Sequence, residues 1–318
     1  MDSQALQKPF SFVELGACMG GFRLAANQFN GRCVFAVETN KIARLHYAQN
    51  FEADKLTDNT DFAANVPKHD IAFAHITHEN LHKNKDLIAQ IESSITQKCQ
   101  TSALVLMPKI LAQKQQKNIA KFCHNLTNAG FYITSKWLSS ELYGAVQARD
   151  DICIIACKQN IMLDQFCWPK HRLISKTLND ILSSGRVNTD LIVAKCNTTK
   201  KLEPQYKTIV RCAAHNRTPV YSSCGIIPKI RAGANCSNGA DCLCAIDGVI
   251  RKLTTREILN SFGFPTGYRI LTEKNISSHT LGQNVFVFLV ELLLIEIFKS
   301  LHLPIFAFGK SVDYQRIS

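Results

Sequence analysis

Short runs of apolar residues alternate with amphipathic segments along the first half of the chain. Segments with helical periodicity, at Phe22–Phe29, Lys85–Thr96 and Gln113–Ala129, separate these runs. Strands that alternate with helices predict a mostly parallel, doubly wound α/β sheet. The runs with the composition of buried strands are Phe10–Leu15, Cys33–Val37, Asp70–His75, Ala103–Met107 and Ile152–Ala156.

The alternation breaks at about residue 160 and gives way, up to about residue 248, to polar sequence rich in Thr, Asn and Lys. This change predicts a second, smaller and less regular domain. Helical periodicity returns at Arg256–Ser261, and Leu281–Leu301 is expected to form one long apolar helix that closes the chain. We therefore expect a large domain from residues 1–165 and 280–302, a small domain from 166–279 and a C-terminal extension from 303–318.

The closing helix approaches the length of a membrane span. Glu291 and Glu296 interrupt its apolar stretch, however, and no basic residues flank it as anchors. A buried helix is the better interpretation, and no membrane partner is expected.

A glycine-bearing turn joins the first predicted strand to the first helix. It spans Gly16 to Gly21, and the acid Glu38 closes the second strand about twenty residues later. Glycines let a cofactor approach the backbone, and a carboxylate in that place can hydrogen-bond the two hydroxyls of a ribose. The pattern indicates a cofactor site of the Rossmann-like kind.

The charge balance points to polyanionic partners. The 37 Lys and Arg residues against 25 Asp and Glu give a net charge of +12, with no run of five basic residues. Such a surface attracts nucleic acid first and anionic membrane second, and any basic patch must be assembled by folding. The polar segment Met1–Pro9 has no features of a secretion signal, so we expect an intracellular protein, in the cytoplasm or the nucleus.

The thirteen cysteines are then expected to be reduced thiols. Most lie in apolar settings, where a free cysteine behaves as a small hydrophobic residue. One Gly- and Asn-rich stretch is the exception, since it gathers His215, Cys224, Cys236, Cys242 and Cys244. A zinc site there is the alternative, but the spacing does not match the usual ligand pairs, so no metal is predicted.

Three segments together resemble the cytosine-5 DNA methyltransferases, in that family's order and over nearly the whole chain. They are Phe12–Leu24, which looks like the cofactor motif, then Ile246–Glu257 followed by Phe262–Pro265, and finally Leu281–Val285. The resemblance implies a domain that holds S-adenosylmethionine, a small domain that reads DNA, and a duplex in the cleft between them.

Two further segments, Tyr221–Gly225 and Ile227–Arg231, resemble the region that follows the family's recognition loops. The resemblance places four polar residues towards DNA. The alternative is that they are ordinary solvated loop residues. The four are Asn216, Arg217, Lys229 and Arg231.

The family attacks cytosine C6 with a cysteine in a Pro-Cys-Gln loop after the fourth strand. At that position this chain has Thr77, His78 and Glu79. Imidazole is a poor substitute, because the reaction needs a soft nucleophile that also leaves again. The loop is also shortened, since only Leu81–Lys85 separates it from the next predicted helix. Capture of a flipped base by this route is therefore not expected.

Two other parts of the family's catalytic set are replaced. Pro108 and Lys109 stand where the resemblance implies the acid of a Glu-Asn-Val motif. The Gln-x-Arg-x-Arg motif keeps its first arginine as Arg149, but its second position is Asp151. The joint loss predicts that the chemistry has been abandoned.

The cofactor motif is only partly retained. Gly16 replaces the family's aromatic residue, and Cys18 replaces the glycine that the cofactor approaches most closely. A side chain at Cys18 would project into the cofactor's methionine end, so we expect no bound cofactor, or S-adenosylmethionine only with weakened affinity. The vestigial cofactor positions that match are Gly20, Gly21, Phe22, Glu38, Asp58 and Asn284.

These expectations combine into a catalytically inactive methyltransferase homologue. It would act as a regulatory subunit that binds DNA, an active methyltransferase, or both. One alternative is a stand-alone nucleic-acid-binding protein. The other is an enzyme with altered chemistry, in which His78 and Glu79 act as acid and base.

Overall fold

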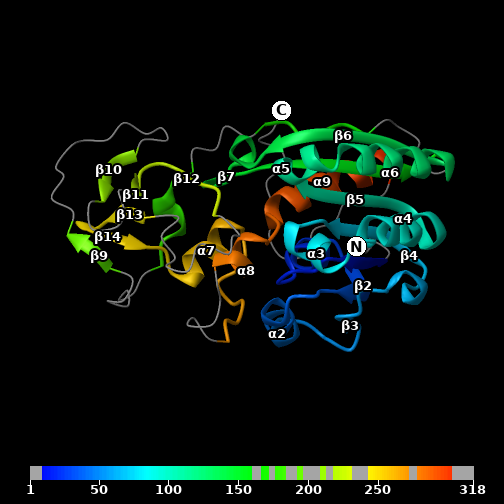
Figure 1. Ribbon diagram of the computed structural model, residues 1–318, viewed down its shortest axis with the longest axis horizontal. Coiled ribbons are helices and arrows are strands. Elements are labelled where there is room, and N and C mark those ends of the chain that lie inside the picture. Colours follow the sequence, from blue (N-terminus) through cyan, green and yellow to red (C-terminus); the bar gives the residue numbers. More distant parts are fainter. Residues whose placement is uncertain are drawn as a thin grey trace, which may run out of the picture.

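The computed structural model describes residues 9–159, 166–171, 176–183, 192–195, 208–212, 218–230, 243–271 and 278–302. A large sheet with helices on both sides lies at one end of the molecule, and a smaller sheet lies at the other (Figure 1). Helices α7 (Thr255–Ser261) and α8 (Ser278–Gly282) lie between the two sheets.

The large sheet has seven strands in the order β3-β2-β1-β4-β5-β8-β6. The first five are parallel, and β8 is antiparallel to both of its neighbours. The predicted doubly wound, mostly parallel α/β sheet is thus confirmed. The strands are β1 (Phe10–Leu15), β2 (Gly31–Val37), β3 (Leu56–Thr57), β4 (His69–His75), β5 (Cys99–Pro108), β6 (Phe131–Ser139) and β8 (Asp150–Lys158).

Each face of this sheet carries its own apolar core. Helix α4 has Leu87, Ile91 and Ile95 at four-residue spacing, so one stripe of the helix faces the sheet. Helices α1 and α9 cover the opposite face. The helices and 3-10 turns of this part are α1 (Gly21–Asn27), α2 (Lys41–Asn50), η1 (Ala63–Asn65), α3 (His78–Lys83), α4 (Leu87–Lys98), α5 (Lys109–Lys114), α6 (Gln116–Asn128), η2 (Ser140–Tyr143) and α9 (Val287–Ser300).

The closing segment 281–301 is not one helix, contrary to the prediction. Helix α8 ends at Gly282, and α9 begins at Val287. The Arg149 guanidinium lies at the break, where Nη1 donates to the carbonyl of Asn284 at 2.7 Å and lies 3.5 Å from that of Gly282. The buried arginine thus binds backbone carbonyls at the point where the helix is interrupted.

The segment Thr280–Ser300 is long and apolar enough to cross a membrane, but 78% of its apolar 18-residue stretch is buried inside the fold. The Phe298 ring lies 5.4 Å from that of Phe10 and 5.5 Å from that of Phe29, both in edge-on geometry. The apolar surface of this segment is therefore covered by the protein's own core, as expected for a buried helix.

The smaller part is more regular than its sequence indicates. It contains a five-stranded sheet in the order β10-β11-β13-β14-β9, although its polar sequence predicted an irregular domain. Its strands are only four or five residues long, so little strand periodicity is visible in the sequence. The strands are β9 (Ile192–Lys195), β10 (Thr208–Cys212), β11 (Thr218–Ser222), β13 (Leu243–Ile246) and β14 (Val249–Lys252).

A two-stranded ribbon, β7 (Gln147–Ala148) with β12 (Ile227–Pro228), joins the two parts, and η3 (Leu178–Ile181) packs beside it. Packing does not follow the expected boundaries at 166 and 279, because Phe166, Phe262, Phe264 and Tyr268 all belong to the core of the large part. The expected extension 303–318 lies outside the described residues.

A buried acid on β1 links four elements of the large part. One Glu14 oxygen accepts the backbone N–H of Arg23 at 3.0 Å, and the other accepts the Tyr47 hydroxyl at 2.5 Å and lies 3.9 Å from the Cys33 thiol. Glu14 is fully buried, and burial raises its pKa to about 7 despite these hydrogen bonds.

The Glu14 carboxyl should make stability fall as pH rises. A folded pKa of about 7 against 4.5 for the ordinary carboxyl means that the folded state binds the proton more tightly. The resulting stabilisation is present below pH 4.5 and is lost between pH 4.5 and 7, by about 3 kcal/mol in all. Glu14→Gln should lose this dependence in urea unfolding at several pH values, whereas Glu52→Gln at an exposed site should keep it. Equal pH slopes in wild type and Glu14→Gln would contradict the assignment.

Candidate functional site

The turn after β1 lies at the carboxyl edge of the sheet, where doubly wound folds bind their ligands. Gly16 has φ +89°, and a Cβ at this position would lie 2.5 Å from the His75 carbonyl oxygen and 3.0 Å from Asn80 Nδ2. Position 16 therefore has no room for a side chain. An aromatic residue does not fit there while Asn80 and His75 keep their positions.

Cys18 occupies a backbone conformation that favours glycine, with φ +49°. Its side chain is buried, and its Sγ donates to the Gln283 carbonyl at 3.1 Å and lies 3.6 Å from His75 Nδ1. The space beside this turn, which a glycine would leave open, is thus filled by a thiol and an imidazole. Burial and the nearby Glu38 carboxyl raise the pKa of Cys18 well above its usual value, so the thiol stays protonated.

Glu38 is placed as predicted, at the end of β2 and facing the turn. One of its oxygens accepts the backbone N–H of Cys18 and the other that of Asn40, both at 2.7 Å. Both oxygens are therefore engaged within the chain. Asp58 lies apart from them and is exposed, where it pairs with Arg44 at 2.8 Å.

The hollow beside Glu38 is nearly closed. Gly16, Thr39, Phe62, Asn80 and Leu87 are among the residues that line it, and about 10 Å³ is open to the centre of a water molecule. That volume holds about one water molecule. The residues present, with Cys18 and His75 filling the adjoining space, do not fit S-adenosylmethionine.

The segment that follows β4 begins helix α3, where a shortened loop was expected. Thr77 and Asn80 form a capping box, in which each side chain bonds the other's backbone N–H. Asn80 Nδ2 also donates to the His75 carbonyl at 2.7 Å. Local hydrogen bonds thus favour a folded helix here over a mobile loop.

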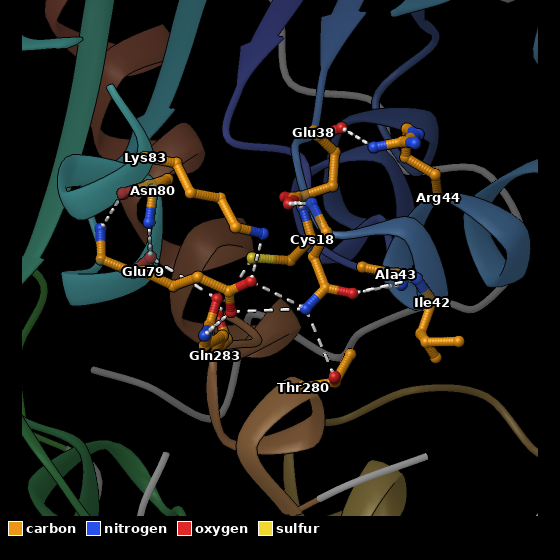
Figure 2. A network of polar contacts seen from close by, with 12 residues as sticks. Cys18, Glu38, Ile42, Ala43, Arg44, Glu79, Asn80, Lys83, Thr280 and Gln283 are labelled. Carbon is orange, nitrogen blue, oxygen red and sulfur yellow. Dashed lines mark hydrogen bonds and ion pairs between the residues drawn. The ribbon is translucent and has the colours of Figure 1, made fainter. Parts of the chain in front are cut away.

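His78 and Glu79 point in different directions from the start of α3. His78 is exposed, and partial burial, with Lys114 and Lys229 nearby, lowers its pKa. Glu79 turns inward to Asn40 and Gln283 (Figure 2). Partial burial opposes its ionisation, but hydrogen bonds from Lys83, Gln283 and Asn40 outweigh that effect and hold its pKa below the usual value. The two side chains therefore do not form the acid–base pair of the alternative interpretation.

The motif that follows β7 forms a buried ion pair. Arg149 and Asp151 have side chains 2% and 4% exposed, with Nη2 2.7 Å and Nε 2.8 Å from the same carboxylate oxygen. The guanidinium also lies 4.7 Å from the centre of the Phe286 ring. Asp151 thus binds the retained arginine instead of leaving it free.

Pro108 and Lys109 lie at the end of β5, beside this motif. Pro108 precedes α5, and the Lys109 ammonium pairs with Asp150 at 3.0 Å and lies 5.9 Å from the Trp137 ring centre. No carboxylate stands at either position, so this part of the site carries a cation.

The other matched cofactor positions serve packing. The Phe22 ring stacks on Phe73 with centroids 5.0 Å apart, and Gly20 and Gly21 begin α1 against Phe51 and Val285. Asn284 is fully buried, and its Oδ1 accepts the backbone N–H of Met19 at 3.2 Å.

Of the four residues expected towards DNA, only Lys229 lies among the described residues, while Asn216, Arg217 and Arg231 lie outside them. Lys229 is half-buried next to the Arg149 motif, where burial and then Arg149 lower its pKa, opposed by Asp151 and Asp150. It therefore lies at the boundary between the two parts, near His78.

The cysteines on the strands of the large sheet are not activated thiols, because burial raises their pKa values. Burial raises the pKa of Cys153, on β8, well above its usual value. Burial also raises the pKa of Cys99, at the start of β5, to about 12. Of the proposed metal cluster, only Cys224 and Cys244 are described, and the described part of the chain contains no group of three metal-ligating side chains.

Sequence reasoning missed three residues that shape the site: Asn40, His75 and Gln283. Asn40 had a signal, since Asn directly before an amphipathic segment is a common helix cap, and its Oδ1 accepts from Ile42 and Ala43 at 3.0 Å. The roles of His75 and Gln283 depend on contacts between distant segments, which no local pattern reveals.

Comparison with known proteins agrees with this geometry. The family model "C-5 cytosine-specific DNA methylase" matches residues 10–299. The type II methyltransferase M.HhaI of Haemophilus parahaemolyticus is 23% identical over 92% of this chain and 95% of its own length. M.MspI of Moraxella is 24% identical over 89% of this chain and 69% of its own length.

Solved structures show the same fold. The Entamoeba histolytica methyltransferase EhMeth matches with a TM-score of 0.70 and 14% identity, over 93% of this chain and 99% of its own. The S. pombe Dnmt2 methyltransferase matches with a TM-score of 0.69 and 16% identity, over 91% and 98%. With its sheet, its glycine turn and the family match over residues 10–299, the chain belongs to the C-5 cytosine-specific DNA methylases, a family that uses S-adenosylmethionine.

Proposed function

We propose that this chain is a non-catalytic member of its family, which binds DNA and an active cytosine-5 methyltransferase as a regulatory subunit. The observation that carries the proposal is the buried pair of Arg149 with Asp151. Asp151 stands at the position of the motif's second arginine, and its carboxylate binds the retained Arg149 instead of offering a cation to a base.

The contacts at the other two catalytic positions support the same proposal. The exposed His78 imidazole cannot replace a thiolate that must both attack C6 and leave again. Lys109, paired with Asp150, offers no carboxylate to a base. The inward contacts of Glu79 disfavour the alternative of an enzyme with altered chemistry.

Weakened or absent binding of S-adenosylmethionine is part of the proposal. It is supported by the side chain of Cys18 and by the closed hollow beside Glu38. DNA as a partner fits the family and the net charge of +12, and an intracellular location follows from that partner.

The first prediction concerns covalent chemistry. DNA that carries 5-fluorocytosine traps an enzyme whose cysteine sulfur has bonded to C6, so this chain with S-adenosylmethionine should give no adduct on a denaturing gel. His78→Cys should also give none, because Arg149 stays paired with Asp151 and no carboxylate is restored at Pro108. A stoichiometric adduct with either protein would refute the proposal, and M.HhaI serves as the positive control.

The second prediction uses the dependence on salt concentration to distinguish binding of DNA from binding of a methyltransferase. Phosphate contacts release counterions, so affinity for duplex DNA should fall steeply between about 50 and 200 mM salt. Lys229→Ala should lower the slope of log affinity against log salt by about 1, while Lys55→Ala, on the exposed loop before β3, should not.

The complex with an active methyltransferase should survive the same salt, because an interface of at least about 1,000 Å² relies on apolar burial. Size exclusion after co-expression measures it. A strictly monomeric chain, together with an unchanged rate and DNA affinity of the methyltransferase, would leave the stand-alone nucleic-acid-binding alternative. Binding of DNA that does not depend on salt would contradict the electrostatic account.

A further inference from the structure

Four polar side chains, those of Asn40, Glu79, Lys83 and Gln283, meet close to Cys18 (Figure 2). We propose that Glu79 acts as a clasp, which holds α2, α3 and the segment before α9 together and closes the cofactor position from inside the chain. This proposal rests on the proposed function and deepens it. The two can nevertheless be tested separately, because the clasp concerns closure of the cofactor position, whereas the proposed function concerns methyl transfer and binding partners.

The Glu79 carboxylate receives donors from three elements. Lys83 Nζ on α3 and Gln283 Nε2 before α9 each lie 2.6 Å from it, and Asn40 Nδ2 at the start of α2 lies 3.1 Å from one oxygen and 3.3 Å from the other. Hydrogen bonds to a charged group are stronger than neutral ones. One side chain therefore connects segments about 40 and 200 residues away in the sequence.

The clasp continues into the side chains that fill the pocket. Gln283, whose amide donates to Glu79, also accepts the Cys18 thiol through its backbone carbonyl at 3.1 Å. The Thr77 hydroxyl lies 3.5 Å from Gln283 Oε1, which ties the start of α3 to the same residue. Opening the pocket thus requires Gln283 to move, and Gln283 cannot move without breaking its contact with Glu79.

A second ion pair in the chain isolates the effect of the clasp. Glu296 and Lys299 on α9 lie 2.8 Å apart, and the Glu296 side chain is 18% exposed against 15% for Glu79. The two acids are matched in exposure and in their lysine partner. They differ in that Glu79 also binds Asn40 and Gln283, so Glu296 is the control for loss of a local ion pair.

Hydrogen exchange measured by mass spectrometry on the full chain tests the clasp. The amides of residues 78–84 should exchange about tenfold faster in Glu79→Ala, the effect expected from the loss of charge-assisted hydrogen bonds. Gln283→Ala should produce the same change from the opposite side, and it remains informative if Glu79→Ala folds poorly. Glu296→Ala should leave these amides at the wild-type rate.

Two results would overturn the proposal. One is exchange in both Glu79→Ala and Gln283→Ala that is no faster than in Glu296→Ala. The other is slower exchange of the wild-type amides 78–84 on addition of millimolar S-adenosylhomocysteine, since that response requires a pocket that is open to the ligand. Neither result depends on methyl transfer, so the proposed function is tested independently.

Discussion

The buried ion pair of Arg149 and Asp151 is the constraint on which the rest of the site depends. Both side chains are at most 4% exposed, so neither charge is solvated by water. Removing one partner of such a pair costs about 3–5 kcal/mol, because it leaves the other charge buried and alone. Loss of either residue alone would therefore leave the other charge buried and unpaired.

A series of contacts leads from this pair to the cofactor position. Arg149 holds the carbonyls that end α8, and the turn formed there presents Gln283 and Asn284 to the glycine turn. Asn284 binds the backbone of Met19, and Gln283 binds both Cys18 and Glu79. Polar side chains at the cofactor position are thus linked to one another by hydrogen bonds within the chain.

The sequence predicts the large sheet well because its strands are buried and its helices amphipathic, and β1 was predicted residue for residue. It predicts the smaller sheet poorly, since strands of four or five residues are too short to show a clear pattern. The break before α9 was not predicted either, and the Arg149 side chain that contacts it comes from more than 130 residues earlier. For the site, local motifs led to the prediction that catalytic residues are replaced at positions 78, 108 and 151. The contacts that fill the pocket, through His75, Gln283 and Asn40, required the tertiary structure.

The most direct test of the account is the coupling energy between Arg149 and Asp151. Urea unfolding of wild type, Arg149→Met, Asp151→Asn and the double variant gives this energy as the departure from additivity. If the pair organises the site, each single variant should lose about 3 kcal/mol or more, and the coupling should be at least about 2 kcal/mol. A coupling below about 0.5 kcal/mol would mean that the two charges act independently, and would contradict the account.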